Sequence, residues 1–143
     1  MVYLSDHGSH FRTRNSEYKR ACHDGDIHVP LLICGPGFEG GRVVPDMVSL
    51  LDIPPTLLAC GGIPTPADFQ GRPLQQLVDG TAVGWPEHVF VRLSEAQVGR
   101  AVRTKKWKYS VRDYSKNGWR ESEERPLRGG FPVRSGGRPV GAK

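Results

Sequence analysis

Three polar side chains near the start of the chain have the types and spacing of a site that binds a cation and an anion together. Asp6 and His7 follow an apolar run, and Lys19 comes thirteen residues after Asp6. A carboxylate favours a hard cation such as calcium or magnesium, while an imidazole also suits zinc or manganese. Lysine adds a compact, mobile positive charge that meets anionic oxygens. Two ligands are too few to hold such a cation alone, so the pattern predicts half of a metal site.

The elements around these residues are expected to bring them together. Residues 2–5 are typical of a strand, 6–28 of a long loop with a short helix, and 30–34 of a second, buried strand. Open α/β sheets bind their ligands at the carboxyl ends of strands. We expect Gly8 to allow a sharp turn there. Taken alone, Asp-His-Gly is more often a polar strand-to-turn junction than a metal site.

The rest of the chain predicts one further helical region and a small sheet. A helix capped by Ser49 or Asp52 is expected to run to about residue 59, with a short helix over 74–78. Three strands, over 89–93, 100–103 and 107–111, predict an antiparallel meander. In the last of them, aromatic residues alternate with lysines, which favours a half-buried strand over a surface for single-stranded nucleic acid.

Composition limits the classes of protein. The 143 residues are 37% hydrophobic and include 18 Gly and 12 Pro, which leaves limited material for an independent core. No apolar run is long enough for a membrane span, so no membrane partner is expected. The three cysteines lack the spacing of a zinc ribbon or a disulfide scaffold. Cys34 and Cys60 are expected to pack in the interior.

Several motifs in order resemble the sulfatase family of the alkaline-phosphatase-like superfamily. The resemblance spans about residues 1–112 and rests on Ser5-Asp6-His7-Gly8, Lys19, Val29-Pro30-Leu31, Gly35-Pro36-Gly37, the segments 47–58, 61–64 and 70–74, and the segment 100–109. It implies an α/β fold: the C-terminal part of a mixed sheet flanked by helices, plus a small antiparallel subdomain. The expected parts are residues 1–84, 85–118 and a disordered basic tail over 119–143.

The resemblance also implies roles for single residues. Asp6 and His7 would bind a divalent cation, calcium in most sulfatases, and Lys19 would contact the sulfate group. Sulfatases more often have Tyr-Glu at residues 23 and 24, and many have His at residue 14. His10, Arg14 and His23 are therefore candidates for contact with the substrate, with a solvated polar loop as the alternative.

One part of the sulfatase pattern is missing from the sequence. Sulfatases convert a Cys or Ser in a Cys- or Ser-x-Pro-x-Arg motif to a formylglycine nucleophile, and none of the three cysteines or the serines lies in such a motif. The chain is therefore expected to be the C-terminal part of a longer enzyme. Its N-terminal part would be the partner that supplies the nucleophile, and the chain alone would be inactive on sulfate esters.

The basic character of the chain comes from its tail. Residues 125–143 hold five Lys or Arg and no acid, which accounts for the whole net charge of +5, so no specific nucleic-acid partner is expected. The tail lacks the Phe-Leu-Tyr-Asp-Leu segment with which sulfatases tend to end. A single-base frameshift between about residues 119 and 131 is one hypothesis for its origin, and the encoding DNA would test it.

Three function classes follow from these observations. The leading one is a sulfuric ester hydrolase, in which the metal and Lys19 stabilise charge on the sulfate oxygens. The second is a phosphodiesterase or phosphonate hydrolase of the same superfamily, with a Thr or Ser nucleophile and two metals. The third is a module without catalysis that binds polyanions through the basic tail.

Overall fold

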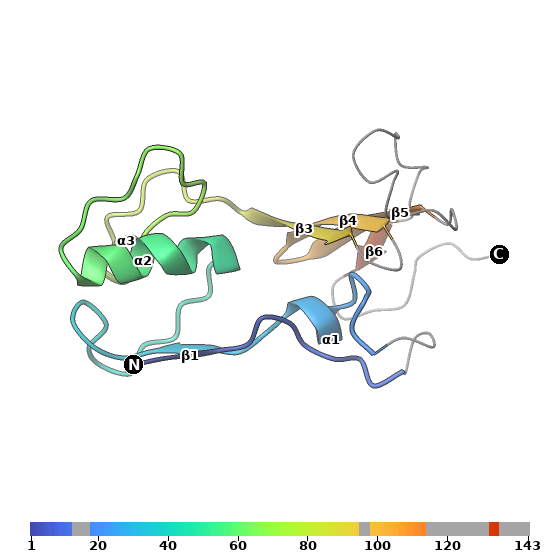
Figure 1. Ribbon diagram of the computed structural model, residues 1–143, viewed down its shortest axis with the longest axis horizontal. Coiled ribbons are helices and arrows are strands. Elements are labelled where there is room, and N and C mark those ends of the chain that lie inside the picture. The colour runs from blue at the N-terminus through green and yellow to red at the C-terminus, as the bar shows by residue number, and fades with distance from the viewer. Residues whose placement is uncertain (13–17, 95–97, 114–131, 135–143) are drawn as a thin grey trace. The chain divides into compact units, whose positions relative to one another are not determined.

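The structure is a computed structural model that describes residues 1–12, 18–94, 98–113 and 132–134 (Figure 1). The chain forms two compact units. Unit 1 consists of residues 1–4 and 30–87, and unit 2 of residues 5–29 and 88–143. The loop with the predicted site residues thus belongs with the C-terminal strands. The expected domain boundaries stay a prediction.

Unit 1 contains a two-stranded sheet, in which β1 (Val2–Leu4) pairs antiparallel with β2 (Leu31–Ile33). The second strand was expected to be buried, and this is wrong. Leu32 is 61% exposed and Cys34 is exposed as well. Among the described residues this sheet has two strands, so alternate side chains have nothing to pack against.

The helices of unit 1 are held by three polar side chains. Ser49 caps the 3-10 helix η1 (Leu50–Asp52), and the Asp52 carboxylate accepts from the Ser49 amide (2.8 Å) and from the Arg72 amide (2.9 Å). The helix α2 (Ile53–Cys60) follows directly, with proline in its first turn. Buried Thr56 accepts from the amide of Leu74, which places the short helix α3 (Gln75–Val78) against α2. Both expected helices are confirmed.

Cys60 is exposed, which corrects the expectation that it packs in the interior. Its sulfur accepts from the side-chain amide of Gln75 at 3.3 Å and donates to the Pro36 carbonyl at 3.8 Å. Cys60, the last residue of α2, therefore makes its polar contacts at the surface of unit 1. No helix in the described segments has the length and apolar content that crossing a membrane requires.

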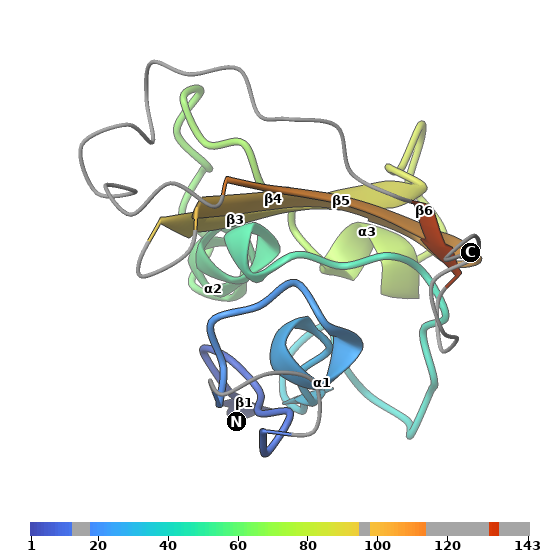
Figure 2. The same cartoon turned by 90° about the vertical axis from the view of Figure 1, so that its right-hand side faces the viewer.

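Unit 2 is built on one antiparallel sheet in the order β3-β4-β5-β6. The strands are β3 (His88–Ser94), β4 (Val98–Thr104), β5 (Trp107–Asp113) and β6 (Pro132–Arg134), and Figure 2 shows them as one twisted layer. The three-stranded meander is confirmed. β6, which pairs with β5, is a fourth strand in the region that was expected to be a disordered tail; the rest of that tail lies outside the described residues.

The two faces of this sheet differ in an unexpected way. Lys108 is 5% exposed, whereas Trp107 and Tyr109 beside it are 46% and 45% exposed. Lys108 pairs with Arg103 on β4, so the two basic side chains lie on one face of the sheet. The buried face of β5 is therefore the face with the lysine, and segment 5–29 explains why.

Candidate functional site

The turn that holds Asp6 and His7 is organised by its own side chains. The Ser5 hydroxyl donates to the His7 carbonyl at 2.7 Å, and the His7 amide donates to Asp6 Oδ1 at 3.0 Å. The other carboxylate oxygen of Asp6, Oδ2, lies 3.7 Å from His7 Nε2. Two neighbouring residues, which would point to opposite faces of a regular strand, thus present their polar atoms to one region.

Gly8 serves a different purpose from the one expected. Its φ is outside the left-handed region, so the turn itself does not require glycine. Its amide donates to the Asp26 carbonyl at 2.7 Å, and a Cβ at this position would collide with the carbonyl oxygen of Gly25. Glycine therefore lets the site turn lie directly against the short helix α1 (Asp24–Ile27).

Hydrogen bonding determines which nitrogen of His7 is available. His7 Nδ1 lies 2.8 Å from the Gly8 carbonyl oxygen, which can only accept, so Nδ1 is the protonated nitrogen of the neutral ring. The lone pair is then on Nε2, which accepts from the Lys19 ammonium at 2.8 Å. The structure thus brings together the three residues that the sequence analysis singled out, Asp6, His7 and Lys19.

These three residues line an open pocket of about 310 Å³. Arg20 lies beside them, and the far side of the pocket is formed by Arg92, Leu93 and Ser94 of β3. The sequence analysis did not find the contribution of β3, because these residues have no motif and lie more than seventy positions from Lys19. The lining holds three cationic side chains and one carboxylate, which suits an anionic ligand.

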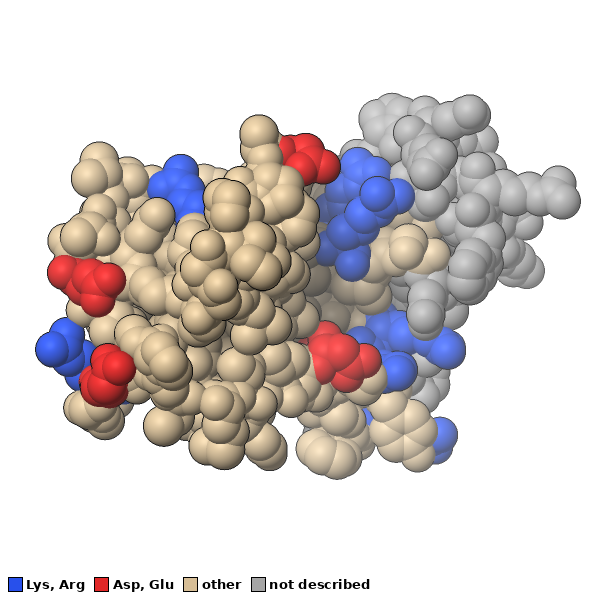
Figure 3. Space-filling model, turned by 60° about the vertical axis from the view of Figure 1, so that its left-hand side comes forward, with Lys and Arg blue, Asp and Glu red and all other residues tan. Residues whose placement is uncertain are grey.

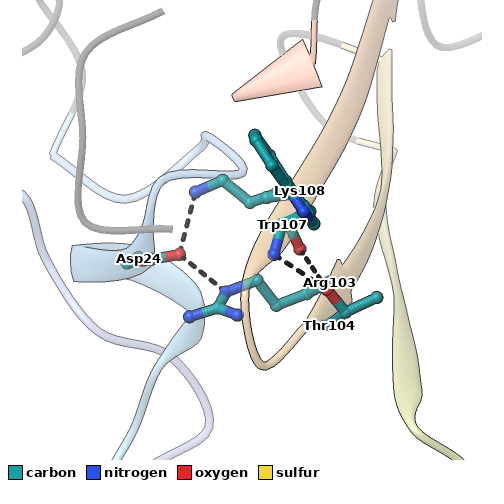
Figure 4. Close-up of polar contacts among 5 residues, drawn as sticks. All are labelled: Asp24, Arg103, Thr104, Trp107 and Lys108. Atoms are coloured by element: carbon teal, nitrogen blue, oxygen red, sulfur yellow. Dashed lines mark hydrogen bonds and ion pairs between the residues drawn. The ribbon is translucent and has the colours of Figure 1, made fainter. Parts of the chain in front are cut away.

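Asp24 anchors segment 5–29 to the sheet. Its Oδ1 accepts from Lys108 Nζ at 2.9 Å, and Arg103 Nε lies 3.4 Å from the same oxygen (Figure 4). Burial would raise the pKa of Asp24, but the hydrogen bond and charge of Lys108, helped by Arg103, outweigh it and hold the pKa below its usual value. The Asp24 carboxylate is therefore ionised in the folded protein at neutral pH.

Two further acidic groups beneath the site are buried. Burial raises the pKa of the Cys22 thiol, an effect that nearby Ser110 and the charges of Arg112 and Lys108 oppose only in part. The thiol is thus protonated at neutral pH and is not an activated nucleophile. Burial likewise raises the pKa of Asp26, and the nearby His10, whose Nε2 is 3.8 Å from Asp26 Oδ2, compensates only in part.

Two of the other candidates for substrate contact, His10 and His23, are not in the pocket lining. His10 is 5% exposed and lies in the interior of unit 2, neither solvated nor facing the pocket. His23 is half-buried, with Nε2 3.4 Å from Arg112 Nη2. Its ring lies nearly perpendicular to that of His10, with the ring centroids 5.6 Å apart. Arg14 lies outside the described residues. The two histidines therefore pack the loop onto the sheet.

Asp6 and His7 are the two candidate metal ligands that the sequence indicated. Nowhere in the described part of the chain do three or more His, Cys, Asp or Glu side chains gather in a way that could hold a metal ion. On the face drawn in Figure 3, basic and acidic side chains lie in mixed groups, and no extended basic surface covers the described residues there. The pocket at Lys19 is thus the candidate anion site that these residues offer.

Comparison with known proteins places this chain in a family. Residues 16–121 match the family "N-sulphoglucosamine sulphohydrolase, C-terminal". This chain belongs to the sulfatase family. The matched region of the sulfatase includes Lys19 and the anchor at Asp24, and it begins after Asp6 and His7.

Individual relatives agree with this assignment. The chain is 35% identical to mouse arylsulfatase K over 119 residues, which cover 76% of this chain and 22% of that protein. It is 41% identical to human arylsulfatase K over 81 residues, 57% of this chain and 15% of that protein. A putative sulfatase from Bacteroides thetaiotaomicron has the same fold, with a TM-score of 0.70 at 23% identity over 93% of this chain and 28% of the other. The expected fold class, part of an alkaline-phosphatase-like α/β fold with a small antiparallel sheet, is confirmed.

We expect Asp24→Asn to lower the free energy of unfolding at pH 7 by about 2 kcal/mol, because the buried ammonium of Lys108 loses its counter-charge. The pKa of Asp24 is lowered by folding, so its ionised form stabilises the protein above the unfolded-state pKa of about 4, and this contribution is lost as the pH falls below it. Urea unfolding followed by tryptophan fluorescence at pH 7 and pH 3 measures both effects.

Asp68→Asn is the matched control, since Asp68 is exposed and the same charge is removed. It should change the free energy of unfolding by less than about 0.5 kcal/mol at either pH. An Asp24→Asn variant as stable as the control at pH 7, or one whose deficit is the same at both pH values, would show that Asp24 is not the anchor.

Proposed function

We propose that this chain contributes the cation-binding and sulfate-binding residues of a sulfatase active site, with Asp6 and His7 on a divalent cation and Lys19 on the sulfate group. The observation that best supports the proposal is the short contact between Lys19 Nζ and His7 Nε2 inside one pocket. Family membership favours this sulfatase function over the phosphodiesterase or phosphonate hydrolase alternative.

The donor atoms fit a hard divalent cation, and we propose calcium. Asp6 Oδ2 and His7 Nε2 are 3.7 Å apart, close enough for both to contact one ion, and the bond from Nδ1 to Gly8 keeps the Nε2 lone pair available. Calcium takes six to eight ligands in proteins, so the remaining ligands must come from outside these two residues. When bound, such a cation stabilises negative charge on the sulfate oxygens.

The contact between His7 and Lys19 couples the two roles. Nε2 has one lone pair, so it cannot ligate a cation and accept from Lys19 at the same time. With Nε2 on the cation, the Lys19 ammonium turns its donors to a sulfate oxygen, where it supports charge that develops as the ester bond breaks. Cation binding and sulfate-ester binding should therefore strengthen each other.

The rest of the active site is proposed to come from another part of the enzyme. The sequence has no motif for a formylglycine, and it spans 22% of mouse arylsulfatase K. Apolar side chains on the surface of unit 1 are suited to contact with that part; those more than half exposed include Tyr3, Leu32, Leu51, Leu57 and Ile63. The partner of this chain is thus the N-terminal region of the same sulfatase.

Calorimetric titration of the chain with propyl sulfate tests the site. We expect calcium chloride to raise the affinity for propyl sulfate several-fold, because the cation releases Lys19 from His7. Lys19→Ala should weaken binding of the ester about tenfold and leave calcium binding in place, whereas Asp6→Asn should weaken calcium binding. Lys105→Ala removes the same charge outside the pocket and should change neither. Equal ester affinity in wild type and Lys19→Ala would contradict the proposal.

We also expect the isolated chain to show no turnover of 4-nitrophenyl sulfate, with or without calcium, because it has no residue that becomes a formylglycine. Release of 4-nitrophenol measured by absorbance is the assay. Hydrolysis that disappears in Asp6→Ala would show that the described pocket is a complete active site and that this expectation is wrong.

A further inference from the structure

The sheet of unit 2 has an exposed face with three large aromatic side chains. Lys108 meets Asp24 of segment 5–29 and marks the covered face, so Trp107 and Tyr109 beside it lie on the opposite face. On β3 the exposed residues alternate with half-buried ones, and Phe90 is 73% exposed. Soluble proteins rarely leave such a group of rings in water unless the surface binds a partner.

Strand register brings these rings together. Phe90 pairs with Val102 on β4, and Val102 pairs with Tyr109 on β5, so the three side chains form one row across the sheet. Trp107 lies on the same face, two residues before Tyr109. We call these four side chains the aromatic face. Phe90 and Tyr109 are two strands apart, about 10 Å, which is comparable to the length of a disaccharide unit.

The charged side chains next to the aromatic face are basic. Arg92 and Arg100 pair in the next row and are both exposed. Arg92 also borders the pocket of the candidate site, but the strand register places its side chain on the aromatic side of the sheet. At the hairpin between β4 and β5, Lys106 Nζ lies 5.7 Å from the centroid of the Trp107 ring. The one acid in the sequences of β3, β4 and β5 is Asp113, the last residue of β5. The aromatic face is therefore suited to an anionic partner.

Rings and cations together recognise an anionic polysaccharide. The C–H faces of sugar rings stack on aromatic side chains, and sulfate or carboxylate groups along the polymer pair with arginine and lysine. A second copy of this chain is a poor occupant, because it would bring two basic surfaces together. Single-stranded nucleic acid would meet the same side chains through its bases and phosphates. The pocket at Lys19 favours the sugar, because a polysaccharide with sulfate esters would supply the ligand of that pocket as well.

We propose that the aromatic face is an exosite, a second binding surface that docks an anionic polysaccharide on the sheet face opposite segment 5–29. Sugar rings stack on the three aromatic side chains, and Arg92 and Arg100 pair with sulfate or carboxylate groups of the polymer. The choice of a sugar over a nucleic acid rests on the proposed function, whereas the stacking surface does not. Docking at this face raises the local concentration of sulfate esters around the enzyme.

Dextran sulfate is the probe, with dextran, polyphosphate and oligothymidylate for comparison. Dextran has the same sugar rings without charge, polyphosphate has charge without rings, and oligothymidylate has phosphates and bases. In calorimetric titrations of the full chain at about 0.15 M salt, we expect dextran sulfate to bind at least about tenfold more tightly than dextran. The basic tail over residues 125–143 is present in every variant, so differences between variants do not come from it.

Phe90→Ala should weaken dextran sulfate binding about fivefold and leave polyphosphate binding within about twofold, because a stacking contact is lost but no charge. Trp107→Ala should act in the same direction. The matched control is Phe69→Ala, which removes the same ring from an exposed position in unit 1 and should change neither affinity. Urea unfolding of each variant measures whether the fold is kept, and the exposure of Phe90 predicts little loss of stability.

The outcomes separate the exosite from the proposed function. Equal dextran sulfate affinity in Phe90→Ala and Phe69→Ala overturns the exosite, as does a loss that is equally large for polyphosphate. If Phe90→Ala weakens oligothymidylate binding as much as dextran sulfate binding, or more, the aromatic face binds single strands and the sugar assignment is wrong. Lys19→Ala tests the pocket instead: unchanged propyl sulfate affinity in that variant overturns the proposed function, whereas the dependence of dextran sulfate binding on Phe90 is measured independently. A loss in Phe90→Ala that is confined to dextran sulfate supports the exosite.

Discussion

The ion pair between Asp24 and the lysine and arginine of the sheet is the constraint on which unit 2 depends. Lys108 is buried, and a buried ammonium is costly unless a carboxylate meets it. Asp24 lies 84 positions earlier in the sequence, so the pairing connects the loop that holds the site to the strands that complete the pocket. Without a carboxylate at this position, the polar face of β4 and β5 would have to turn to solvent.

The same anchor explains why the site turn can be so short. Asp24 begins α1, and the carbonyl of Asp26 in that helix accepts from the Gly8 amide. Fixing α1 on the sheet therefore also fixes the backbone beside Asp6 and His7. The orientation of the His7 ring then follows from its bond to the Gly8 carbonyl, which leaves Nε2 toward Lys19. Structural stability and ligand geometry thus share one set of contacts.

Much of the local structure could be predicted from the sequence because its signals are local. The cap at Ser49, the prolines at the start of α2 and the alternation in β3 each act within a few residues. Predictions of burial were less successful. Cys34 was expected inside from its apolar neighbours and is exposed, and Lys108, which a surface pattern would place outside, is buried. Burial depends on what covers a face, and this is decided by contacts between distant segments.

The sequence by itself determined which side chains make up the candidate site: a carboxylate, an imidazole and a lysine thirteen residues after the carboxylate, from which a cation beside an anion was predicted. The order of these residues among other motifs indicated the family that the comparisons confirm. Only the tertiary structure decided that Gly8 is needed for a close approach, that Nε2 is the available nitrogen, and that the end of β3 borders the same pocket. The physical reason is range. Side-chain type and spacing determine structure over a few neighbouring residues. Packing brings together residues more than seventy positions apart, and no local pattern specifies which ones.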